Sequence, residues 1–435
     1  MTKHPEHRGR RGQGERGSIL IQVAVASVVL IAFSMYVVDY GMMLVGRRQA
    51  QNAADGAALA GAIAMAFDAD DRSPNGPAKM AAYNVSQVHG VIGEAPNVID
   101  PSGGDATDIM FYGEAPAKFP PECADDSCIR VDVYRNQQRG NALPSWFGAL
   151  LGVSDQGVKA TATAQAGIGD TTNCLKPWAV LDKWTENWED GKAATEPWSQ
   201  TSDYDKYYTK GPDKGNPDPS ITNPDVYVAP TTTSTGTGLY PFNPDGTPSP
   251  WYGLQYTLKT GSLQGDFDPT SGWFLALALS DSKGGKDYKN NIKGCIGLDY
   301  TIGQELPIDT EPGNKVGPTR QAVVDDDDSL VNQDPSAYWD TSLNGGAGGV
   351  AGSMFSVSPR IVPVPLVNPD LMAEVMKGGR DSVPISNIMG FFIEGLTADK
   401  KGVVGRLCAI PGMKASGASA ISEESAFLKV IQLVR

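Results

Sequence analysis

One uncharged, apolar segment near the N-terminus constrains this chain more than any other feature. No Asp, Glu, Lys or Arg occurs from Gly17 to Val38, and aliphatic side chains dominate this segment. At about 1.5 Å per residue, a helix of this length spans roughly 30 Å, which is the thickness of the hydrocarbon core of a bilayer. The segment therefore predicts a transmembrane helix.

The residues before this segment indicate its orientation. Residues 1–17 contain two acidic residues, Glu6 and Glu15, and the following cations: Lys3, Arg8, Arg10, Arg11 and Arg16. Lys and Arg accumulate on the cytoplasmic side of a membrane helix. We therefore expect residues 1–17 to form a basic cytoplasmic tail and residues 18–46 to form a single-pass anchor in a bacterial inner (cytoplasmic) membrane. The remaining chain is then periplasmic or extracellular.

A cleaved signal peptide is the main alternative for this segment. It requires a shorter apolar run that is followed by a small-residue cleavage site. The small-residue sequence Ala24-Val25-Ala26 lies inside the run. A signal anchor therefore fits the segment better.

Charge and histidine content restrict the function. The net charge of −14 argues against nucleic acid as a partner, because few cations are available to neutralise phosphates. The three histidines are His4, His7 and His89, and the first two lie in the basic tail. A Ser-His-Asp or Cys-His site outside the membrane would have to use His89. We predict that the protein is not an enzyme and that it binds no cofactor and no metal ion. Acid–base catalysis by carboxylate pairs such as Asp266 and Asp268 stays an alternative.

The run Asp325-Asp326-Asp327-Asp328 offers clustered oxygen ligands of the kind that calcium prefers. It lacks the spaced aspartates and the glycine of a known calcium loop. A solvated acidic turn is the preferred interpretation.

The chain after the apolar segment favours a continued helix. Residues 47–62 are rich in alanine, which has the highest helix propensity, and no proline occurs before Pro74. Small residues recur there at helical spacing: Ala50, Ala54, Ala57, Gly61 and Ala64. Such a stripe allows another helix to approach closely. The alternative is that the alanines only stiffen a stalk.

Three sequences in this N-terminal region form a recognisable pattern: Gly17-Ser18-Ile19-Leu20, Val38-Asp39-Tyr40-Gly41 and Arg48-Gln49-Ala50-Gln51-Asn52-Ala53-Ala54-Asp55-Gly56-Ala57-Ala58-Leu59-Ala60-Gly61-Ala62. With this pattern the region resembles the TadE/TadG-like group of Flp (Tad-type) pilus-assembly proteins. The resemblance covers about fifty residues. It implies a membrane-anchored, minor-pilin-like component of a pilus or secretion apparatus, which contacts the lipid bilayer and other pilus-assembly or pilin-like proteins through its N-terminal helix.

The pilin-like junction at Gly17 departs from the pattern of processed pilins. Those pilins carry Gly before the cleavage site and Glu at the fifth mature position, which is Gln22 in this chain. An amide cannot neutralise the N-terminal amine of a neighbouring subunit. We therefore predict a TadG-like protein that keeps its tail and is not a major pilin.

The remaining chain is expected to form two regions, which makes the protein α+β. Residues 47–170 combine the long helix with a small pilin-like sheet, because residues 129–133 and 158–166 alternate apolar and polar side chains. The small alanines on one face of 158–166 predict that the long helix packs on this sheet. Ser145 to Leu151 is expected to be a short amphipathic helix, and the segment "SWFGALLG", at 145–152, resembles the TadG-like module. Residues 171–435 are expected to form a mainly β domain, with strands near 253–259, 273–279, 360–367, 387–393 and 427–434. This region lacks the Asp-x-Ser-x-Ser metal motif of a von Willebrand factor A domain.

The five cysteines favour disulfides, because disulfides persist outside the cytoplasm. Cys123 and Cys128 are close in sequence and have no histidine nearby, so a disulfide is preferred to a metal site. Cys174, Cys295 and Cys408 leave one unpaired thiol, and the sequence alone does not assign the pair. We adopt Cys174–Cys295 as the working pair.

Two functions remain. The first is the structural or assembly component, whose working surface would be the Ala/Gly stripe and the distal domain. The alternative is a cell-envelope adhesin or ligand-binding module that uses the same anchor without joining a pilus. Its partner would be a surface glycan or a protein ligand.

Overall fold

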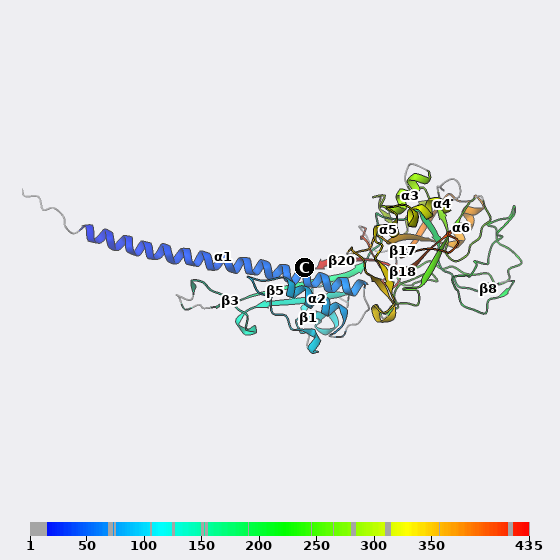
Figure 1. Ribbon diagram of the computed structural model, residues 1–435. Helices are drawn as coiled ribbons and strands as arrows, with labels where there is room; N and C mark the ends of the chain where they lie inside the picture. Colours follow the sequence, from blue (N-terminus) through cyan, green and yellow to red (C-terminus); the bar gives the residue numbers. More distant parts are fainter. Residues whose placement is uncertain are drawn as a thin grey trace, which may run out of the picture.

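The computed structural model describes residues 15–67, 73, 75–104, 107–123, 127–148, 152, 155–189, 191–244, 246–263, 265–279, 284–308, 315–355, 357–415 and 421–434. Residues 1–14 of the predicted basic tail lie outside these ranges. The protein is elongated, with a long helix at one end, a small α/β module in the middle and a larger β-rich domain at the other end (Figure 1).

The long helix α1 runs without interruption from Glu15 to Phe67. It contains no proline, and alanine-rich sequence continues the helix after the apolar segment ends. The apolar side chains of its first half are exposed, as Leu20 (74%) and Phe33 (64%) illustrate. In the described part of the chain, α1 is the one helix that is long and apolar enough to cross a membrane.

The second half of α1 packs on a five-stranded sheet. The strand order is β1 (Ile109–Phe111), β2 (Cys128–Arg135), β5 (Val158–Ile168), β20 (Leu428–Val434) and β19 (Ile410–Pro411). All neighbours are antiparallel except β19 and β20, which are parallel. The alternating small residues of β5 are buried beneath α1: Val158, Ala160, Ala162, Ala164 and Ala166. Helix α2 (Pro77–Val88) packs beside α1 on this module.

The last strand of the chain corrects the expected domain boundary. Strand β20 belongs to the sheet of the first module, because Ile431 pairs with Ala166 and Leu433 pairs with Ala164 of β5. Two strands of the expected distal range 171–435, β19 and β20, therefore belong to the sheet of the first module. The C-terminal strand returns because β5 has two edges, and β2 covers only one of them.

The distal domain is built around a closed sheet. Its strand order is β17 (Ser382–Leu396), β16 (Ile361–Val367), β7 (Trp178–Leu181), β11 (Trp273–Ala276), β10 (Gln255–Gly261) and β18 (Gly402–Cys408). Strand β18 also pairs with β17, which closes the six strands into a barrel, and β13 (Glu305–Pro307) extends β17 on its other side. Closure leaves no unpaired edge among the six strands.

Strands β7, β11 and β16 are continuous apolar runs because they are buried on both faces, whereas β10 alternates buried and more exposed side chains. Trp178, Phe274, Val364 and Phe391 are completely buried. Helices α3 (Gly285–Lys293), α4 (Val316–Arg320), α5 (Leu330–Gln333) and α6 (Pro369–Met376) lie outside the barrel, together with long loops. The five strands that the sequence predicted are present as β10, β11, β16, β17 and β20. The α+β class, with an N-terminal helix and a mainly β distal domain, is confirmed.

The described residues also form four short two-stranded ladders. They are β3 (Leu143–Pro144) with β4 (Asp155–Gln156), β6 (Thr171–Thr172) with β12 (Tyr300–Thr301), β8 (Trp188–Glu189) with β9 (Lys192–Ala193), and β14 (Tyr338–Asp340) with β15 (Gly349–Ala351).

Candidate functional site

A contact at the end of the apolar segment is made by Asp39, the first charged residue after that segment. Its carboxylate is buried, and four donors from one turn converge on it. The Ser145 hydroxyl donates at 2.9 Å, and the backbone N–H groups of Trp146, Phe147 and Gly148 donate at 3.0, 3.1 and 2.6 Å. Hydrogen bonds to an ionised acceptor are about twice as strong as neutral ones. Asp39 therefore fastens the turn at 145–148 to α1.

Aromatic side chains surround this contact. Trp146 is 66% exposed. On α1, the exposed rings of Tyr36 and Tyr40 stack with centroids 5.9 Å apart. Residues 149–151 of the expected short helix lie outside the described residues, and residues 145–147 form an irregular turn rather than a helix.

The Ala/Gly stripe is buried within the chain itself. Ala50, Ala54, Ala57, Gly61 and Ala64 all face the module. The approach is closest at Gly61, where an added Cβ would lie 2.7 Å from Ile129 Cδ1 of β2 and 3.2 Å from the Ala78 carbonyl oxygen of α2. The stripe therefore does pack against a helix, but that helix is α2 of the same chain. The stripe is not a free surface for a partner, which corrects the expected working surface.

The pilin-like junction lies in a regular part of α1. Both Gly17 and Gln22 are helical, and the Gln22 side chain is exposed. No break in the helix separates the junction from the apolar segment.

An apolar groove lies where α1, the module sheet and the distal domain meet. The C-terminal carbonyl of α1, on Phe67, accepts hydrogen bonds from the Asn344 amide at 3.4 Å and the Tyr252 hydroxyl at 3.5 Å. The groove beside this contact has a volume of about 670 Å³. Its lining includes these apolar side chains: Leu59, Ile63, Tyr252, Trp339, Phe355, Val357 and Ile431.

One wall of the groove is held by a buried carboxylate. Asp334 is completely buried and accepts hydrogen bonds from the hydroxyls of Ser353 and Ser358, both at 2.6 Å. These contacts hold Phe355 and Val357 at the surface, where they are 49% and 46% exposed. The sequence contains no local signal for this groove, because its lining comes from segments that are far apart in the chain.

The structure contains both expected disulfides, Cys123–Cys128 and Cys174–Cys295. Cys408 is buried at the base of the groove as a free thiol. Burial raises the pKa of this thiol to about 12, which keeps it protonated and unreactive at neutral pH.

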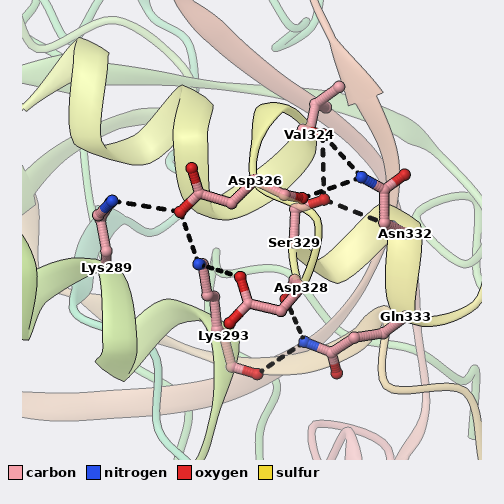
Figure 2. Close-up of polar contacts among 8 residues, drawn as sticks. All are labelled: Lys289, Lys293, Val324, Asp326, Asp328, Ser329, Asn332 and Gln333. Carbon is pink, nitrogen blue, oxygen red and sulfur yellow. Dashed lines mark hydrogen bonds and ion pairs between the residues drawn. The ribbon is translucent and has the colours of Figure 1, made fainter.

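The acidic run at 325–328 is paired with cations of the same chain (Figure 2). Asp326 binds Lys293 of α3 at 2.6 Å and Lys289 at 3.2 Å, and Asp328 also contacts Lys293. The lysine ammonium groups lower the pKa of Asp326. Asp325 binds Arg320 at 2.6 Å. Asp325, Asp327 and Asp328 are exposed, so the run is a solvated acidic turn as the sequence favoured, and ion pairs of Asp326 and Asp328 also join it to α3.

His89 is the exposed C-cap residue of α2, and Asp266 and Asp268 are also exposed. In contrast, the carboxylates of Glu186 and Asp225 are neighbours within the distal domain. Burial first, and then the neighbouring charge of Asp225, raises the pKa of Glu186 to about 8. Asp225 accepts backbone hydrogen bonds from Asn187 at 2.7 Å and Asp205 at 2.8 Å.

The sequence contains no local signal for the Glu186–Asp225 pair. The two residues are far apart in an irregular segment, so no local spacing could have brought them to notice. Burial raises the pKa of Asp225 as well.

Comparisons with known proteins bear on α1. Neither the curated proteins nor the solved structures contain a match to the chain. A family model described as "Putative Flp pilus-assembly TadE/G-like" matches residues 17–66. The matched range covers nearly all of α1 and includes Asp39 and the Ala/Gly stripe. The resemblance seen in the sequence is therefore confirmed for this helix: residues 17–66 match the family of TadE/G-like Flp pilus-assembly proteins.

Proposed function

We propose that the chain is a membrane-anchored, minor-pilin-like structural or assembly component of a Flp-type pilus or secretion apparatus, and that it is not an enzyme. The family match on α1 carries this proposal. The exposed apolar side chains in the first half of that helix support it, because lipid or apolar helices are the surroundings that such a surface requires.

The structure supports a role for α1 in holding the distal domain away from the membrane. From Asp39 to Phe67 the helix has no break, and at about 1.5 Å per residue this part is roughly 40 Å long. The buried stripe and the capped C-terminal carbonyl tie α1 to both the module and the distal domain. The barrel would thus stand at a fixed distance from the bilayer, with the N-terminus in the cytoplasm and the bulk outside.

The exposed apolar face of residues 19–38 is the proposed contact with other pilin-like proteins. The stripe at 50–64 is already covered by α2 and β5, so it is assigned to internal packing. Gln22 in place of the pilin glutamate favours a component that keeps residues 1–17. Intact-mass measurement of the membrane-extracted protein tests this point, and loss of those residues would contradict it.

The apolar groove favours a second candidate function. A concave, apolar surface with a few polar groups is typical of ligand sites. An adhesin or ligand-binding module anchored by α1 would use this groove or the barrel loops for a surface glycan or protein ligand.

An anchor exchange separates the two functions. The chromosomal gene is replaced by a version in which residues 18–38 are exchanged for an unrelated transmembrane helix of equal length. An assembly component requires its own helix, so we expect loss of pili while the protein still reaches the membrane. The wild-type gene, reintroduced, serves as the control. Normal piliation with the foreign helix would contradict the proposal and favour the adhesin.

A further inference from the structure

We propose that the turn at Ser145–Gly148 is a second membrane contact, which places Trp146 among the lipid headgroups where α1 leaves the bilayer. This inference rests on the proposed anchoring by α1. It adds a lipid-binding element that lies more than a hundred residues from the anchor in sequence.

The depth of the turn follows from the length of the apolar segment. Twenty residues from Ile19 to Val38 form roughly 30 Å of helix, which fills the hydrocarbon core and leaves Asp39 at its boundary. The Trp146 backbone N–H lies 3.0 Å from the Asp39 carboxylate. The turn is therefore at the level of the headgroups when residues 19–38 fill the hydrocarbon core.

The turn is also held rigidly at that level. Four donors from residues 145–148 converge on the single Asp39 carboxylate. Next to the turn, Leu143 of β3 is buried against α1, where an added Cβ on Gly46 would lie 2.9 Å from Leu143 Cδ1. The β3–β4 ladder lies alongside α1 on the membrane side of the module (Figure 1). Both contacts fix the turn relative to the helix.

The exposed side chain has the chemistry of an interfacial anchor. All eight tryptophans lie in the described residues, and the other seven are buried or half-buried, whereas Trp146 is 66% exposed. Trp and Tyr are enriched at membrane–water interfaces, because an apolar ring with one polar group suits that region. Tyr36 and Tyr40 supply two more exposed rings next to Asp39 on α1. Lipid covers this aromatic group better than water does.

A second contact would restrict how α1 moves in the bilayer. A single helix can tilt and rotate about its axis, and interfacial aromatic residues limit both motions. Trp146 lies off the helix axis, so its attachment to the headgroups would fix the rotation of α1. The face that α1 presents to neighbouring helices in the membrane would then be constant.

Fluorescence quenching in vesicles tests the proposal. The full-length protein is reconstituted into phosphatidylcholine vesicles with lipids brominated either near the headgroup or near the bilayer centre. Because Trp146 is one of eight tryptophans, we expect headgroup-proximal bromines to quench about one-eighth of the emission. Trp146→Phe should abolish this quenching, and Trp188→Phe, in the distal domain, should retain it. Asp39→Asn should reduce it, because the turn is then released from α1.

Flotation of the vesicles separates this proposal from the proposed anchoring. If the protein floats with the vesicles but Trp146→Phe is quenched as much as the wild type, the turn does not contact lipid and the inference is wrong. If the protein does not float, the anchoring by α1 is wrong. An intact Cys174–Cys295 disulfide in each variant verifies that the chain has folded.

Discussion

The carboxylate of Asp39 accepts a hydrogen bond from the hydroxyl of Ser145 at 2.9 Å, although the two residues are 106 positions apart in sequence. Three consecutive backbone N–H groups complete the contact. Asp39 is one of the residues on which the resemblance to TadE/TadG-like proteins depends, and this contact gives it a physical role. It joins the end of the apolar segment of α1 to the folded module.

Replacing Asp39 by Asn should loosen the turn at 145–148. The single amide oxygen accepts fewer hydrogen bonds than the two carboxylate oxygens and carries no charge, so the hydrogen bonds from the N–H groups of Trp146, Phe147 and Gly148 are weakened and not all of them can persist. Hydrogen exchange of these amides should accelerate on the order of tenfold. Ser145→Ala removes a single donor and should have a smaller effect. Unchanged exchange in Asp39→Asn would contradict the clamp.

Gly61→Leu should destabilise the module. An added Cβ meets Ile129 Cδ1 at 2.7 Å and the Ala78 carbonyl oxygen at 3.2 Å, so α1 must move away from α2 and the sheet. Overpacking of this kind typically costs about 1–3 kcal/mol. Gly41→Leu is the matched control, because nothing lies within 4 Å of an added Cβ there. Thermal unfolding in detergent measures both, and equal melting temperatures would refute the close packing at Gly61.

The two disulfides should differ in their contribution to stability. Cys174–Cys295 closes a loop with a sequence separation of 121, whereas Cys123–Cys128 has a separation of 5. In the chain-entropy model these loops correspond to roughly 5 and roughly 2 kcal/mol. Replacing the first pair by alanine should therefore lower the free energy of unfolding more than replacing the second pair. Denaturant titration of the two double variants gives the comparison, and the reverse order would show that the entropy model fails here.

Glu186 should make the stability of the distal domain depend on pH. Its pKa is raised from 4.5 to about 8, so the folded state favours the protonated form. The stabilisation from this proton is complete below pH 4.5 and is lost as the pH rises through about 8. With allowance for residual solvent, the loss is on the order of 1–2 kcal/mol.

The variant Glu186→Gln resembles the protonated acid and should remove this part of the pH dependence. Its melting temperature relative to the wild type should therefore rise between pH 4.5 and pH 8.5. The exposed Glu196→Gln provides the control. A constant difference between Glu186→Gln and the wild type across this range would contradict the buried carboxylate pair.

Much of the N-terminal half could be predicted because its signals are local. The apolar segment and the alanine-rich sequence after it specify one continuous helix by composition alone. The alternation of small and polar residues in β5 is also a local signal, because the side chains of a strand point alternately to its two faces. The Cys123–Cys128 disulfide closes a loop so short that its two cysteines are always near each other.

The partners of these elements could not be predicted in the same way. The sequence identified the stripe that includes Ala54 and Gly61 and indicated that the long helix packs on the small sheet, but it did not indicate that α2 of the same chain would also cover the stripe. The solvated turn at Asp326 was expected, but its ion pair with Lys293 was not, because α3 supplies this lysine from a distant part of the sequence. In each case the composition of the segment indicated its character, but the residues that contact it lie far away in the sequence.

The long apolar helix, its continuation and the β-rich character of the distal region follow from local sequence, because helix propensity and apolar periodicity depend on neighbouring residues. Three other features depend on the packing of the whole chain: β20 joins the first module, β17 and β18 close the barrel, and Asp39 contacts the turn at 145–148. These contacts join residues that are remote in sequence. A strand edge or a buried carboxylate requires a partner but does not specify which part of the chain supplies it, and packing of the whole chain makes that choice.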